Sequence, residues 1–208
     1  LSPDGARVYV TSAQESVLTA LDAASLQVLW TASIPGGADD VALAPSGALG
    51  YVASSQSRSV SVVDLRDGSV RSTITVAAGA DALAVTPDGA QVWVMSSGGE
   101  QNLTGPPSSR NAGTLTVISA RTLRAVRTMR AGTIPHDVLI SPSGARAYVL
   151  SWGSNQIWSY NARSYRILDR IATRSWPMAM AINPDGSRLL IAHSIPGAVP
   201  AQPVTTIN

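Results

Sequence analysis

Short apolar runs separated by turn residues recur along the whole chain. Each unit of this pattern predicts four strands, which in the second unit cover 41–43, 49–53, 60–63 and 70–76. In the last of these strands, one face carries Val70, Ser72, Ile74 and Val76, and the other carries Arg71, Thr73 and Thr75. A half-polar strand of this kind is typical of the outer edge of a sheet. The chain is therefore expected to be all-β.

A four-residue turn sequence joins the first two strands of every unit. Its last three residues are Pro, Asp or Ser, and Gly, and its copies begin at Ser2, Ala44, Thr86, Ser141 and Asn183. Pro presets φ for the turn, the Asp or Ser side chain accepts a local backbone hydrogen bond, and Gly adopts positive φ. Successive copies are 42, 42, 55 and 42 residues apart, so the third unit contains an insertion of 13 residues. A period in the low forties with strand-like content is typical of a β-propeller blade.

These repeats divide a single domain into units at 1–38, 39–80, 81–135, 136–177 and 178–208. The first unit lacks its innermost strand, and the fifth contains the first two strands and a third near 204–207. Joining the two ends would leave strands over, so clean closure is not expected. We therefore expect four-stranded antiparallel blades, about five in number, incomplete at one or both ends and part of a seven-bladed ring. An unusual five-bladed ring is the alternative. The start at Leu1 rather than Met indicates an upstream segment.

The second strand of each unit resembles the repeat of the YVTN family of β-propellers. The copies read Tyr9-Val10-Thr11-Ser12, Tyr51-Val52-Ala53-Ser54, Trp93-Val94-Met95-Ser96, Tyr148-Val149-Leu150-Ser151 and Leu190-Ile191-Ala192-His193. A later Val-Ile-Asp signature survives at 20–22 and 62–64 and fades at 117–119 and 159–161. The resemblance spans the chain and implies a periplasmic, secreted or cell-surface location, but it says almost nothing about activity.

The composition excludes several kinds of site. The chain has no Cys, Lys or Phe, and its 15 arginines against 13 carboxylates give a net charge of only +2. A charge this small does not indicate nucleic acid. Disulfides, thiolate metal sites and cysteine-linked haem are excluded, and no apolar run is long enough for a membrane span. No nucleophile elbow, phosphate-binding loop or zinc-binding His-Glu motif is present.

Candidate chemistry lies where the blade connections share one face. The position before each innermost strand holds Asp39, Asp81, His136 and Met178 in successive units, and the next holds Asp40, Ala82, Asp137 and Ala179. His193 ends a second strand on the same face. The catalytic candidates are His136, His193, Asp39 and Asp81, and Asp39, Asp81 and His136 are candidate ligands for Ca²⁺ or Mg²⁺; no other cofactor is predicted. The alternative is a polar lining, in which Asp39 and Asp81 cap turns by accepting backbone hydrogen bonds.

Two long segments are expected to project from this face, 98–113 and the stretch after His193. Loops of this length in compact domains are often functional, although a tolerated surface insertion explains them equally well. Asn102 also begins a glycosylation sequon. The candidate ligand-binding residues are Trp152, His136, Asp137, His193, Asn102 and Arg110.

Arginine is concentrated in the outer parts of the third and fourth units. The eight residues are Arg121, Arg124, Arg127, Arg130, Arg163, Arg166, Arg170 and Arg174. One interpretation is an anionic partner such as polysaccharide, lipid head groups or nucleic acid. The other is that charge on outer strands prevents edge-to-edge association. Nucleic acid is disfavoured because packing between blades accounts for Trp158 and Tyr160, which would otherwise serve as stacking platforms.

Three functions are compatible with these features. The first is a non-catalytic binding or scaffolding propeller outside the cytoplasm that recognises a protein or cell-surface partner. The second is a metal-assisted hydrolase or lyase, since similar propellers host lactonases that use a metal at the channel mouth. The third is a subunit that docks a cofactor-bearing electron-transfer partner.

Overall fold

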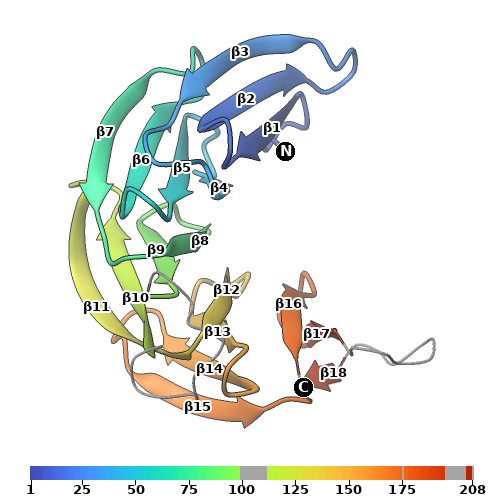
Figure 1. Cartoon of the computed structure of the whole chain (residues 1–208). Helices are drawn as coiled ribbons and strands as arrows, with labels where there is room; N and C mark the ends of the chain where they lie inside the picture. The colour runs from blue at the N-terminus through green and yellow to red at the C-terminus, as the bar shows by residue number, and fades with distance from the viewer. Residues whose placement is uncertain (99–111, 175, 195–204, 208) are drawn as a thin grey trace.

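The computed structural model describes residues 1–98, 112–174, 176–194 and 205–207. These residues form only strands among the regular elements, arranged in five antiparallel sheets. Figure 1 shows the sheets following one another around an open arc, as the blades of a propeller do. We number them blades 1 to 5. No helix capable of crossing a membrane occurs in the described part of the chain.

The strands match the units expected from the sequence. Blade 1 contains β1 (Arg7–Ser12), β2 (Val17–Asp22) and β3 (Val28–Ser33). Blade 2 contains β4 (Asp40–Leu43), β5 (Leu49–Ser54), β6 (Ser59–Asp64) and β7 (Val70–Thr75). Blade 3 contains β8 (Ala80–Val85), β9 (Gln91–Ser96), β10 (Ala112–Ser119) and β11 (Arg124–Thr133).

Blade 4 contains β12 (Pro135–Ile140), β13 (Arg146–Ser151), β14 (Gln156–Asn161) and β15 (Ile167–Ala172). Blade 5 contains β16 (Pro177–Ile182), β17 (Leu189–His193) and β18 (Thr205–Ile207). In the four-stranded blades the first strand lies at the inside of the arc and the fourth at its outer edge (Figure 1). The two end blades have three described strands each, as the repeat pattern predicts.

The Pro-Asp/Ser-Gly turns connect neighbouring blades as well as strands. The glycines have φ between 69° and 74°, which suits a residue without a Cβ. The Asp side chains accept the expected local bonds, for example from Ala90 N–H to Asp88 Oδ1 at 2.9 Å. A Cβ added to Gly89 would lie 3.3 Å from Cδ of Pro45 in the preceding blade. Gly47, Gly144 and Gly186 approach Pro3, Pro87 and Pro142 in the same way. The turns therefore form a ladder of Pro–Gly contacts along one face, which we call the turn face.

Each blade packs on the next through an apolar cluster. Successive side chains of a strand point to opposite faces, so Val92 and Val94 of β9 pack toward Tyr51 in blade 2. Trp93 and Met95 of the same strand pack toward blade 4. The middle strands are thus buried on both faces, which explains their nearly continuous apolar sequence.

In blades 1 to 4, a polar residue at the end of β2, β6, β10 and β14 holds the turn that follows. Its side-chain oxygen accepts a turn N–H bond, at 2.8 Å in Asp22 and Asn161, 3.0 Å in Asp64 and 3.4 Å in Ser119. The signature that fades in the sequence therefore keeps its hydrogen-bonding role. Asp64 also forms ion pairs with Arg66 and Arg71. Hydrogen bonds from Arg66, together with its charge, hold the pKa of Asp64 well below its usual value.

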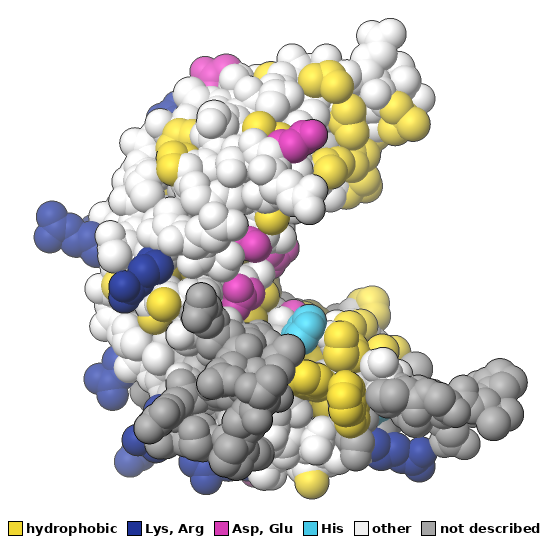
Figure 2. All heavy atoms as spheres, in the orientation of Figure 1, with side chains coloured by type: hydrophobic (Ala, Val, Ile, Leu, Met, Phe, Trp, Pro, Cys, Tyr) yellow, Lys and Arg dark blue, Asp and Glu magenta, His cyan; other side chains and the backbone are white. Residues whose placement is uncertain are grey.

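The two ends of the arc expose apolar side chains that equivalent positions bury. Val10 is 46% exposed, whereas Val52 and Val94 at the same repeat position are fully buried. Leu190 is 38% exposed, whereas Trp93 at its equivalent position is fully buried. Figure 2 shows hydrophobic side chains on both ends facing the opening. Within the described residues no strand pairing joins blade 1 to blade 5, so the arc is open.

Candidate ligand-binding face

The face opposite the turn face carries the connections between second and third strands and between successive blades. We call it the loop face. Every sequence-predicted catalytic candidate lies on it, as does Trp152. The surroundings of these residues differ: some accept hydrogen bonds from the backbone and support the fold, whereas others are exposed to solvent.

Asp39 and Asp81 close the ends of the second strands of their blades. Asp39 Oδ2 accepts a hydrogen bond from Ser55 N–H at 2.7 Å, and Asp81 Oδ2 accepts one from Ser97 N–H at 3.1 Å. Burial raises the pKa of Asp81, and the Ser97 bond and the nearby His136 partly offset that rise. The geometry matches the capping alternative, although the donors follow β5 and β9 rather than lying in the connection between blades.

Asp40 and Asp137 occupy the next position and bridge to the following blade. Asp40 Oδ2 accepts a bond from Leu83 N–H in β8 at 2.9 Å, and Asp137 Oδ2 accepts one from Met180 N–H in β16 at 3.1 Å. Burial raises the pKa of both carboxyl groups. The sequence identified Asp137 as a ligand candidate, and the structure shows it also joining two inner strands.

His136 begins the innermost part of blade 4 and is exposed. Its charge lowers the pKa of Asp81 and Asp137 slightly against the larger effect of burial. The structure therefore brings His136 within electrostatic range of two carboxylates. No group of three His, Asp or Glu side chains able to hold a metal ion occurs in the described ranges.

His193 stands where the other blades use serine to anchor a connection. The hydroxyls of Ser54, Ser96 and Ser151 donate to the carbonyl oxygens of Gly37, Ala77 and Ala131 at 2.5, 3.3 and 2.8 Å. All three serines are buried. His193 is partly buried and lies opposite Pro177 in the β16–β17 ladder. Its place at the end of β17 is thus an anchoring position of the fold.

Trp152 and Trp176 form an aromatic pair on the loop face. Their ring centroids are 5.3 Å apart at an interplanar angle of 80°, an edge-to-face arrangement. Trp152 lies in the β13–β14 turn, and Trp176 precedes β16 in the next blade. Trp176 is 44% exposed, and its backbone N–H donates to Asn155 Oδ1 at 3.0 Å. The pair therefore presents aromatic surface to solvent across a blade junction.

Trp176 occupies a backbone position that favours glycine. Its φ is 61°, and the equivalent residues Gly37, Gly79 and Ile134 have φ of 90°, 69° and 46°. A left-handed conformation costs an ordinary residue about 1–2 kcal/mol. Glycine removes this cost in blades 2 and 3, whereas Ile134 in blade 4 and Trp176 in blade 5 adopt the conformation despite it.

Trp176 was not among the residues predicted from the sequence. Aligning the repeats would have shown a Trp where two other units have Gly, and that contrast was the available signal. Asn102 and Arg110, which were predicted to bind ligand, lie outside the described residues.

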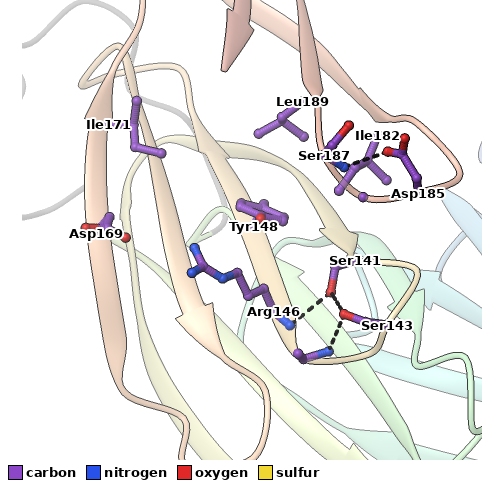
Figure 3. Close-up of a pocket in the computed structure, with 12 residues that line it drawn as sticks. Ser141, Ser143, Arg146, Tyr148, Asp169, Ile171, Ile182, Asp185, Ser187 and Leu189 are labelled. Carbon is purple, nitrogen blue, oxygen red and sulfur yellow. Dashed lines mark hydrogen bonds between the residues drawn. The ribbon is translucent and has the colours of Figure 1, made fainter. Parts of the chain in front are cut away.

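Two cavities among the described residues lie on the turn face, away from these candidates. One of about 480 Å³ lies between blades 4 and 5, and Figure 3 shows Arg146 extending in it between Tyr148 and Asp169. Another of about 810 Å³ lies between blades 3 and 4 and is lined by Gln91 and Tyr165, among others.

Repeat equivalence explains the cavity beside Arg146. At the same strand position, Arg7 donates to Leu65 O of the next blade at 2.6 Å. Gln91 Nε2 likewise lies 3.1 Å from the Tyr165 hydroxyl in the next blade. Both partners belong to the turn after the third strand, and no such turn of blade 5 lies among the described residues. The cavity beside Arg146 therefore lies where blades 2 and 4 place the turn after their third strand, and a cavity lined by Tyr165 is present at the second of these junctions as well.

No protein-family model and no curated protein matches the chain. A solved structure that resembles it is hydrazine synthase of Kuenenia stuttgartiensis, with a TM-score of 0.82 and 24% sequence identity. The match covers 99% of this chain and 59% of that one. At this identity the likeness shows the fold alone. Since hydrazine synthase contains a β-propeller, the blades and their likeness together define an all-β, propeller-type fold.

Proposed function

We propose that this chain is a non-catalytic binding module that recognises a protein or cell-surface partner through its loop face. The observation that carries the proposal is the Trp152–Trp176 pair, in which Trp176 is exposed and Trp152 is half-buried. Tryptophan is enriched among the residues that dominate binding energy at interfaces. Trp176 also sits in a backbone conformation that two other blades assign to glycine. Ile134 adopts the same conformation with its side chain buried, so the support for binding comes from the exposure of Trp176 rather than from its backbone conformation.

His136 extends the proposed site along the same face. It is exposed, and Trp152 N–H donates to Ile134 O at 3.0 Å, two residues before it in sequence. Asp137 lies beside it and joins the blade that carries Trp176 through the Met180 bond. The ligand residues proposed here are therefore Trp152, Trp176 and His136, with Asp137 in support.

We further propose that the arc belongs to a seven-bladed ring outside the cytoplasm. The exposed side chains of Val10 and Leu190 support ring completion, because Val52, Val94 and Val149 are fully buried where a blade precedes them, and Tyr51 and Trp93 are buried where a blade follows. The YVTN-like repeats support the location. A complete ring would leave the loop face accessible, since that face lies at the ends of the strands.

The test begins by immobilising the chain and identifying captured cell-envelope proteins by mass spectrometry. The affinity of the recovered partner is then measured for wild type and for the Trp152→Ala/His136→Ala variant. We expect at least a tenfold loss, because truncated interface hot spots cost more than about 1 kcal/mol. Leu26→Ala is the control, since it removes an exposed apolar residue from the opposite face. Equal affinity of all three proteins would exclude the loop face.

A metal-assisted hydrolase or lyase is the second candidate. Its support is a set of half-buried carboxyl groups whose pKa is raised by burial, Asp40, Asp81 and Asp137, with the exposed His136 within electrostatic range of the last two. Calorimetric titration with Ca²⁺, Mg²⁺ and Mn²⁺ tests it, with Asp81→Asn as the matched variant. Stoichiometric binding that disappears in the variant would favour this candidate over the binding module.

A further inference from the structure

Charge is divided unevenly between the two halves of the molecule. Residues 1–98 contain four arginines and nine carboxylates, whereas residues 112–174 contain nine arginines and two aspartates. The small net charge of the chain conceals this division. In Figure 2 the basic side chains project from the outer edge of the arc, mostly over its lower part.

Seven of these arginines form what we call the basic rim. It comprises the outer strands β11 and β15 and the turns that precede them: Arg121, Arg124, Arg127, Arg130, Arg163, Arg166 and Arg170. All seven are exposed, and within the described residues none forms an ion pair. Arg170 lies over the Trp158 ring, 4.3 Å from its centroid. The guanidinium groups of the rim are thus open to an external anion.

Aliphatic side chains project between the arginines because of a repeated β-bulge. Near its start, the ladder of each outer strand skips one residue, which is Val126 in β11 and Leu168 in β15. A bulge leaves its extra residue unpaired and turns it away from the ladder. Val126 is 51% exposed and Leu168 is 43% exposed. Arg124 and Arg127 flank the first, and Arg166 and Arg170 flank the second.

Protection of sheet edges does not account for the rim. Charge of either sign would protect an edge. Within β11, β15 and the turns that precede them, however, every charged residue except Asp169 is arginine. The equivalent outer strand β3 has no charged residue, and the one arginine of β7, Arg71, is paired with Asp64. The basic rim is therefore specific to blades 3 and 4.

We propose that the basic rim binds the surface of a lipid bilayer with anionic head groups. Guanidinium groups match phosphate oxygens with paired hydrogen bonds. A bilayer surface also offers an apolar layer beneath the head groups, into which Val126 and Leu168 can insert. Hydrated polyanions give these two side chains no apolar partner. Trp158 lies beneath Arg170, so the rim offers nucleic acid no open stacking platform there.

Flotation with phosphatidylcholine vesicles, with and without 30% phosphatidylglycerol, tests the proposal at physiological ionic strength. The wild-type chain should partition onto the anionic vesicles only, and more weakly as salt increases. Arg124→Gln/Arg166→Gln should lower the partition coefficient about 25-fold, at about fivefold for each basic residue near an anionic surface. Arg58→Gln/Arg188→Gln changes the net charge equally, away from the rim, and should lower it much less.

The aliphatic residues provide an independent test. Val126→Ser/Leu168→Ser should lower partitioning about threefold or more through lost apolar burial. Leu29→Ser, at the equivalent bulge of β3, should leave it unchanged. Thermal unfolding of each variant establishes that it is folded. The proposal is overturned if the wild-type chain does not bind anionic vesicles, including the case in which it binds heparin or single-stranded DNA instead. It is also overturned if the two double arginine variants lower the partition coefficient equally.

Discussion

The second residue of the YVTN-like tetrapeptide offers a matched series for measuring blade packing. It is valine in four blades, Val10, Val52, Val94 and Val149. The last three are fully buried between blades, whereas Val10 is 46% exposed at the end of the arc. One substitution, Val→Ala, therefore probes the same strand position with and without a preceding blade.

The expected costs follow from the burial of each side chain. Removing two buried carbons loses about 1.6 kcal/mol of transfer free energy. The residual cavity brings the cost of Val94→Ala to about 2 kcal/mol. For a domain of this size that cost lowers Tm by about 4–8 °C. Val10→Ala should cost less than about 0.8 kcal/mol, because nearly half of its side chain is already in water.

Differential scanning calorimetry of the 208-residue chain measures the four variants under one condition. A Val10→Ala cost equal to that of Val94→Ala would refute the open end of the arc, because it would mean that another surface covers Val10. In a longer protein with a blade placed before Val10, the same substitution should become as costly as the others. The difference between the two backgrounds would then measure the missing blade contact directly.

Three further substitutions test individual contacts. Asp137→Asn keeps an acceptor for Met180 N–H but removes a carboxyl whose folded pKa is raised. The wild-type chain should therefore lose stability relative to the variant as pH rises from about 4, and urea titrations across pH measure this. Asp64→Asn should do the reverse. The lowered pKa of Asp64 supplies stability above its unfolded value that is lost on acidification, so the variant should show a flatter acid limb. Gly132→Ala, at φ 85° and with its Cβ 2.0 Å from Ser151 Oγ, should cost about 3 kcal/mol or more in urea unfolding; a cost below 1 kcal/mol would contradict this packing.

The fold was predictable because its determinants are local and repeated. The Pro-Asp/Ser-Gly turn specifies its own backbone, and five copies establish the strand ranges around it. The polar residue that holds the next turn is also local, so Asn161 and Ser119 can replace Asp without changing the structure. The prediction of a half-polar outer strand is similarly confirmed in β7.

The candidate site was less predictable because its contacts cross between blades. No spacing in the sequence indicates that Asp40 and Asp137 bond to the next inner strand, since those bonds depend on how blades pack. The aromatic pair joins Trp152 to Trp176 across the same kind of junction. For His193 the repeat alignment did predict the position, but only the bonds of the equivalent serines show what that position does.

The Pro–Gly ladder has a consequence for how such a molecule can change in size. Each of the three middle turns supplies both halves of the contact, as where Pro45 approaches Gly89 of the next blade and Gly47 approaches Pro3 of the preceding one. Duplication or loss of a whole 42-residue unit therefore recreates the ladder without requiring any new interface. The 13-residue insertion comes between β9 and β10 in the sequence, outside the turns that form the ladder. Blade number and loop length can thus evolve independently, one through recombination of units and the other through local insertion.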